Sequence, residues 1–261
     1  MFHGSSVSEN DSQKRLLQCI SSFQGGGNDQ EVEIRLGFLQ ADGRFQAGVP
    51  LYVFDRLETE MKQAGLASNN KWEEVVDYFY CLPGNGRKQV RTRVTTNTEE
   101  MTLEKEHIIK TCTQSVILTR GLDQGEVCRV VLSREEKVFC PPQACLPNHV
   151  RIKQRKRFQD IRNEKVAWCY ELSKTWSSSS RQGAEHLQHT CEPVYEVECE
   201  LVDEGFCYTE KKSAPYIVKS LLMKSNVLLG EEPDFSLSIH DPNESSKETD
   251  GKRRKKTIKE V

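Results

Sequence analysis

The 261-residue sequence predicts a mainly β (α+β) protein built around a closed antiparallel eight-stranded β-barrel. From Trp72 onward, apolar residues recur with a period of two, which is typical of strands. Turn residues such as Pro83-Gly84-Asn85-Gly86 separate successive segments and favour antiparallel pairing. Several segments have one fully charged face. We therefore expect a barrel with a polar lumen and an apolar outer face that a few helices partly cover.

The expected elements follow one another simply along the chain. Helical spacing of apolar residues predicts helices over 14–23, 51–66 and 213–229. After a first strand that begins near residue 31, strands are expected over 75–82, 89–95, 102–110, 115–119, 127–135, 150–158, 166–173 and 195–202. We interpret 13–230 as one folded domain and expect 1–12 and 231–261 to be disordered. His186 and His189 are expected to be exposed in a polar loop.

Composition narrows the class of protein. The net charge is −2, so any contact with nucleic acid must come from a local patch. No run of 18 apolar residues occurs and the N-terminus lacks a signal-peptide core, so we expect no membrane partner. The ten scattered cysteines are interpreted as reduced thiols of an intracellular protein. Cys140, Cys145 and His149 fall short of the four ligands of a structural zinc site and are interpreted as loop residues.

Two segments place glutamates at every second position, and a third does the same with cations. The glutamates are Glu31 and Glu33 in the first segment and Glu196, Glu198 and Glu200 in the last. The cations are Arg151, Lys153, Arg155 and Arg157. Each segment alone is typical of a solvated strand face. Together they indicate a site for metal and phosphate, because stacked carboxylates need a cation and a transferred phosphoryl group needs Arg or Lys.

Three segments in this order, EVEIRLGF, RIKQRKRF and YEVECELV, resemble the motifs of the triphosphate tunnel metalloenzymes. Within that family the chain resembles the metal-dependent RNA 5′-triphosphatases of fungal and protozoan mRNA capping, and in size the stand-alone protozoan enzymes. The resemblance spans roughly residues 30–230 and makes 13–230 the expected catalytic domain. It implies removal of the γ-phosphate from triphosphate-ended nascent RNA, which leaves a diphosphate end for guanylylation.

The resemblance also implies roles for individual residues. Mn²⁺ or Mg²⁺ would be bound by Glu31, Glu33 and Glu200. Glu135 and Glu198 would orient the attacking water, while Glu196 would hold a neighbouring cation. Arg151 would also support the carboxylates from the same strand face. The phosphates would be bound by five cations: Arg93, Lys105, Arg151, Lys153 and Arg155.

Two positions of this pattern stay open. Either Glu135 or Glu136 is the site residue of its strand. We favour Glu135 because it lies an even number of residues from Arg129 and Ser133 and so shares their strand face. Glu171 and Ser173 stand where the family often has Asp and Thr. The basic residue that the family has just before them is Cys169 here, which departs from the pattern.

Other functions are weighed beside this one. The chain could be a tunnel-family hydrolase of inorganic triphosphate, thiamine triphosphate or free nucleotides, or a non-catalytic RNA-binding barrel. Cys81 and Arg87 have the Cys-x5-Arg spacing of cysteine phosphatases, which need a helix directly after the arginine. The residues that follow, 88–95, have a strand pattern. We therefore interpret the segment as a hairpin.

Partners and location are expected from the same resemblance. The expected partners are the 5′-triphosphate end of nascent RNA, nucleoside triphosphates in vitro and an RNA guanylyltransferase. Five consecutive cations, Lys252 to Lys256, are interpreted as either a nuclear import signal or an RNA-attracting patch. A capping role favours the nucleus.

Overall fold

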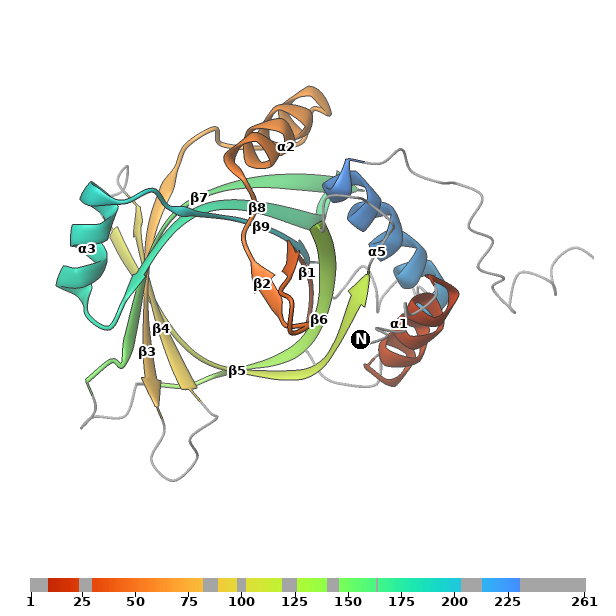
Figure 1. The fold of residues 1–261 in the computed structure, drawn as a ribbon, viewed down its shortest axis with the longest axis horizontal. Helices are drawn as coiled ribbons and strands as arrows, with labels where there is room; N and C mark the ends of the chain where they lie inside the picture. The colour runs from red at the N-terminus through yellow and green to blue at the C-terminus, as the bar shows by residue number, and fades with distance from the viewer. Residues whose placement is uncertain are drawn as a thin grey trace, which may run out of the picture.

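Nine strands and four helices make up the described part of the chain (Figure 1). The computed structural model describes residues 9–23, 30–81, 89–97, 102–118, 126–139, 146–162, 164–202 and 213–230. The strands are β1 (Gln30–Leu39), β2 (Phe45–Ala47), β3 (Glu73–Cys81), β4 (Gln89–Asn97), β5 (Thr102–Leu118), β6 (Glu126–Lys137), β7 (His149–Arg162), β8 (Lys165–Ser178) and β9 (Val194–Leu201). The helices are α1 (Glu9–Phe23), α2 (Leu51–Gln63), α3 (Arg181–Thr190) and α5 (Ala214–Leu229).

The sheet closes on itself into the predicted antiparallel barrel. Its order is β2-β1-β6-β5-β4-β3-β7-β8-β9, and β9 pairs with β1 to complete the ring. The closing register sets Glu33 opposite Glu200 and Arg35 opposite Glu198. The short β2 pairs only with β1 among the described strands, so eight strands form the wall and β2 extends it at one end.

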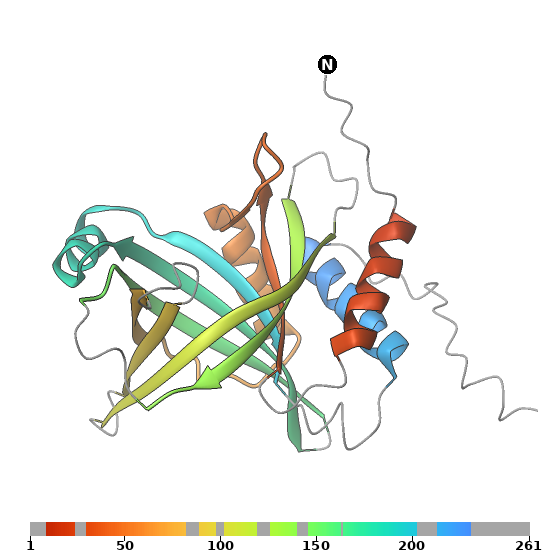
Figure 2. The same ribbon diagram turned by 90° about the horizontal axis from the view of Figure 1, so that it is seen from below.

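The hydrophobic core lies outside the barrel, between the wall and the helices. Outward residues of β1 and β6, such as Ile34 and Leu132, are fully buried in one apolar cluster with residues of α1, α2 and α5. Figures 1 and 2 show α1 and α5 side by side on one wall. Because this apolar contact forms outside, the lumen is free to carry charge, as the sequence predicted.

Three local predictions were wrong. Residues 102–110 and 115–119 form one strand, β5, with a bulge between Cys112 and Gln114. The polar residues there looked like a turn, but the Thr113 hydroxyl donates to the carbonyl oxygen of Leu132 at 2.9 Å and keeps the segment in the sheet. The stretch around His186 is α3 instead of a loop; its only buried residue is Ala184, so it has little apolar periodicity. Helix α1 begins at Glu9, inside the segment expected to be disordered.

The hairpin interpretation of Cys81 is confirmed. Cys81 ends β3 and pairs with Gln89 at the start of β4, so a strand follows Arg87 and no phosphate-binding helix begins there. The intervening residues 82–88 lie outside the described residues, as do Cys140, Cys145 and the basic tail at 252–256. Among the described helices, none has the length and apolarity to span a membrane.

The external core predicts where the fold is most sensitive to mutation. Leu132→Ala, at a position with 0% exposure, should lower the free energy of unfolding by about 2–5 kcal/mol. Leu103→Ala, on the same sheet but 70% exposed, should change it by less than about 0.5 kcal/mol. Urea unfolding followed by circular dichroism measures both, and equal effects would contradict an external core.

Candidate active site

The lumen is a charged cavity of about 1130 Å³. Residues paired across neighbouring strands lie on the same face of a sheet, so the register identifies which side chains face inward. On the β9–β1–β6 wall these include Glu31, Glu33 and Glu200. Arg93 on β4 and Lys153 and Arg155 on β7 line the same cavity. One chamber therefore holds both the carboxylate rows and the cation row.

A cluster of carboxylates with too little positive charge lies on β1, β6 and β9. Lys110 on β5 ion-pairs with Glu31, with Glu33 at 3.0 Å and with Glu135 at 3.8 Å. Glu200 forms no such pair with any residue that the structure describes; burial, followed by repulsion from Glu31 and Glu33, raises its pKa to about 8. Even with the Arg35 guanidinium, which pairs with Glu33, this corner of the lumen holds more carboxylates than cations.

The residues of this corner fit a divalent cation by their chemistry. Glu31, Glu33 and Glu200 offer hard oxygen ligands, and an added cation would relieve the repulsion that raises the pKa of Glu200. Within the described residues, no three acidic, His or Cys side chains are arranged as a preformed metal site. The ammonium group of Lys110 lies among these carboxylates and balances two of them instead.

Opposite this corner, the basic strand β7 is paired with acids of its neighbours. Lys153 is buried and its ammonium group lies 2.9 Å from Glu171 and 3.7 Å from both Glu196 and Glu198. Arg155 bridges Glu73 at 3.0 Å and Glu171 at 3.4 Å. Burial would raise the pKa of Glu171, but Lys153 and Arg155 lower it to about 2. The row is thus held in position by carboxylates along its length.

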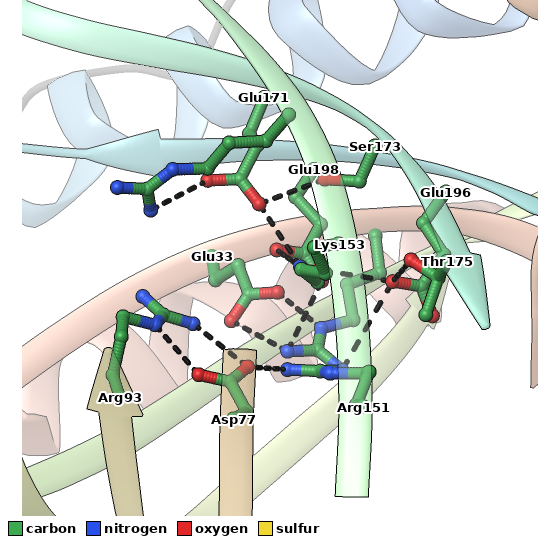
Figure 3. Close-up of polar contacts among 12 residues, drawn as sticks. Glu33, Asp77, Arg93, Arg151, Lys153, Glu171, Ser173, Thr175, Glu196 and Glu198 are labelled. Atoms are coloured by element: carbon green, nitrogen blue, oxygen red, sulfur yellow. Dashed lines mark hydrogen bonds and ion pairs between the residues drawn. The ribbon is translucent and has the colours of Figure 1, made fainter. Parts of the chain in front are cut away.

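Asp77 joins two of the arginines (Figure 3). Its carboxylate accepts from Arg93 at 2.8 Å and from Arg151 at 2.7 Å. Although burial alone would raise the pKa of Asp77, the two guanidinium groups hold it well below its usual range. Asp77 has 0% exposure, so this carboxylate fixes both arginines from within the wall.

The glutamates of β9 have different surroundings. Burial would raise the pKa of Glu198, but Arg35 and Lys153 hold it below its ordinary range, so Glu198 is ionised. Arg35 lies 3.3 Å from it. Glu196 accepts from the Thr175 hydroxyl at 3.0 Å and lies near Lys153 (Figure 3). Glu198 is therefore a permanent anion next to the carboxylate cluster.

The register decides between Glu135 and Glu136, which the sequence left open, and shows the face of β5 on which the predicted phosphate-binding residue Lys105 lies. Glu135 pairs with Lys110 on the lumen face, whereas Glu136 pairs with Ile109 on the outer face. Lys105 pairs with Val94, whose strand face is the outer one, although Lys105 also borders the cavity. Lys110, five positions on, is a lysine of β5 that faces the lumen. The catalytic and binding roles of all these residues remain predictions.

Sequence reasoning missed several lumen residues, among them Arg35, Asp77, Arg91 and Lys110. Arg35 has the same parity as Glu31 and Glu33, and this signal could have identified it. Asp77 interrupts the apolar and aromatic run from Val75 to Tyr80 in β3, which is also a usable signal. Cys169 faces the lumen opposite Glu200 on the neighbouring strand, and burial raises the pKa of its thiol to about 12. Cys169 is thus a neutral residue where the family pattern has a cation.

The Asp77 pairs predict a stability effect. Asp77→Asn should cost about 3–5 kcal/mol at pH 7, because it leaves Arg93 and Arg151 buried without their counter-ion. The folded-state pKa of Asp77 lies below its unfolded value of about 3.9, so its contribution is present above that pH and is lost as the pH falls below it. The variant should therefore show a weaker loss of stability below about pH 4.

Asp42→Asn is the matched control, because Asp42 forms a largely exposed ion pair with Arg44. It should cost less than about 1 kcal/mol. Urea titrations at several pH values measure both variants. Equal losses for the two would show that the Asp77 pairs do not stabilise the barrel.

Comparison with solved structures gives the same architecture. The fold is similar to the RNA triphosphatase Pct1 of S. pombe, with TM-score 0.60 and 17% identity over 86% of this chain and 93% of that one. For Pct1 in complex with the Spt5 CTD, the TM-score is 0.61 and the identity 19%, over 86% of this chain and 94% of that one. For the triphosphatase of the Mimivirus capping enzyme, the TM-score is 0.52 and the identity 14%, over 86% of this chain and 99% of that one. No family model and no curated protein sequence matches the chain. The chain therefore has the tunnel fold of the capping RNA triphosphatases.

Proposed function

We propose that this protein removes the γ-phosphate from the 5′-triphosphate end of nascent RNA, in a reaction that depends on Mn²⁺ or Mg²⁺. The product is the diphosphate end used in mRNA capping. One observation carries the proposal: the cavity holds a carboxylate cluster short of positive charge and, on the facing strands, a row of buried cations. A bound divalent cation would supply the positive charge that the cluster lacks, and the fixed cations would contact the phosphates that it carries.

The phosphate-binding role falls to the cation row. Arg93, Lys153 and Arg155 line the cavity, and their acidic partners hold them in place before any ligand enters. Cations fixed in this way can stabilise charge on a transferred phosphoryl group at little reorganisation cost. Arg151, which pairs with Asp77 and lies 4.0 Å from Glu196, supports the row. Lys110 replaces Lys105 as the lysine of β5 that faces the phosphates.

The carboxylates divide into two groups. Glu31, Glu33 and Glu200 would hold the metal, which when bound neutralises charge on the γ-phosphate. Glu198 stays ionised because of Arg35 and Lys153, and is placed to orient the attacking water together with Glu135. Glu196, close to Lys153, keeps that cation in position.

Phosphate-release assays distinguish two further functions from the proposed one. A hydrolase of inorganic triphosphate or free nucleotides would use the same charges but would not prefer RNA. A non-catalytic RNA-binding barrel would release no phosphate from any triphosphate. Guanylyltransferase partnership and a nuclear location remain expectations of the capping role.

The metal proposal predicts loss of activity when a ligand is removed. Phosphate release from triphosphate-ended RNA should need Mn²⁺ or Mg²⁺ and stop in excess chelator. Glu31→Ala, Glu33→Ala and Glu200→Ala should each lower turnover by about 100-fold or more, because each removes a charge-stabilising group. Glu136→Ala is the matched control: Glu136 lies on the outer face of β6, so turnover should stay near wild type. Full activity in chelator would rule out the metal-dependent reaction.

The hairpin at Cys81 predicts which phosphatase mechanism operates. Cys81→Ser should retain most of the activity, because Cys81 ends a strand and pairs with Gln89. A cysteine nucleophile would not survive this change. The assay is the same phosphate release, with circular dichroism as the check on folding. An inactive but folded Cys81→Ser variant would overturn the tunnel mechanism in favour of a thiol-based one.

A further inference from the structure

A second hollow, of about 860 Å³, lies on the outside of the barrel and adjoins the mouth of the lumen. It lies between α3 and the outer faces of β7 and β8, on the flank where Figure 1 shows α3. Glu74 and Gln154 line both this hollow and the lumen cavity. Glu74 and Gln154 pair across β3 and β7, so the two spaces border the same part of the wall, which we call the rim; the outer hollow is called the α3 groove.

Trp72 and Lys174 lie at this rim. Trp72 lines the lumen cavity and is 36% exposed, although its ring stacks on Phe54 with centroids 6.2 Å apart. Lys174 lines the α3 groove, and its ammonium nitrogen lies 4.9 Å from the centroid of the Trp72 ring. The partly open Trp72 ring thus lies next to two cations: Lys174, and Lys156 at 5.7 Å, which Glu58 binds at 3.0 Å.

Lys174 keeps its charge available. In the part of the chain that the structure describes, it forms no ion pair; its one recorded contact is the Trp72 ring. Of the three acids that line the α3 groove, Glu185 binds Arg181 at 2.7 Å and Glu192 accepts from the Tyr195 hydroxyl at 3.1 Å, whereas Glu74 forms no ion pair within the described residues. Lys174 is therefore the cation of this surface that can meet an added anion.

We propose that Trp72 and Lys174 bind the body of the RNA as it leaves the lumen; this rests on the proposed function. Single-stranded RNA is bound by aromatic rings that stack with bases and by cations that meet the phosphates. Trp72 would contact a base close to the triphosphate, and Lys174 the adjoining phosphodiester. Inorganic triphosphate has neither group, so this contact selects RNA over small triphosphates.

The test compares two substrates in each variant. For Trp72→Ala and Lys174→Ala, the ratio of kcat/KM for a triphosphate-ended RNA 20-mer to that for inorganic triphosphate should fall about tenfold. Lys174→Arg, which keeps the charge, should restore most of the ratio. The matched controls are Tyr216→Ala and Lys219→Ala on α5. The exposed fraction of Tyr216, 39%, is similar to that of Trp72. Both controls should keep the wild-type ratio.

A binding assay separates this inference from the proposed function. Fluorescence anisotropy of the same RNA with a 5′-hydroxyl end needs no hydrolysis, and both variants should bind it about tenfold more weakly than wild type. Lys174→Ala decides the outcome if the loss of the Phe54 contact unfolds Trp72→Ala. Wild-type affinity in folded Lys174→Ala would overturn the RNA contact, even if the enzyme hydrolyses RNA ends. A wild-type protein that cleaves only inorganic triphosphate would overturn the proposed function instead.

Discussion

Charge compensation inside a closed wall is the constraint on which the site depends. A buried ion without a counter-ion costs far more than a hydrophobic contact gains, so each inward charge needs a partner. Asp77 lies between Arg93 and Arg151, and Glu198 lies between Arg35 and Lys153. The same pairs that allow the lumen to be charged also fix its side chains. At the carboxylate cluster this compensation is incomplete, which is why the cluster and not the cation row is the place that we assign to a metal.

The apolar core outside the barrel allows the fold to be stable with a charged lumen. Apolar residues of β1, β6, β8 and β9 pack outward against α1, α2 and α5, so the contacts that stabilise the barrel do not compete with the charged residues for space. Alternation along each strand then separates the two tasks residue by residue. Ile34 is buried in the outer core while Glu33 and Arg35, its neighbours in sequence, face the lumen. A ligand can therefore enter the barrel without disturbing its core.

The sequence predicts a large part of this arrangement, because a period-two pattern indicates both that a segment is a strand and which of its side chains share a face. The barrel, its polar lumen and the positions of Glu31, Glu33 and Glu200 follow from alternation. It could not decide the facing of β5, since both faces carry charge around Lys105 and only the register with β4 and β6 shows that Lys110 points inward. Nor could it show α3, whose polar helix buries little. The Trp72–Lys174 contact joins the residue before β3 to a residue within β8, so it required the three-dimensional fold.

The central claim is that the carboxylate cluster and the cation row act on one metal-bound triphosphate. Anomalous diffraction from crystals with Mn²⁺ and a non-hydrolysable triphosphate tests it most directly. The account predicts an anomalous peak coordinated by Glu31, Glu33 and Glu200, with the triphosphate between that peak and Lys153 and Arg155. A lumen without manganese, or manganese bound at another place while the triphosphate occupies the cavity alone, would contradict it.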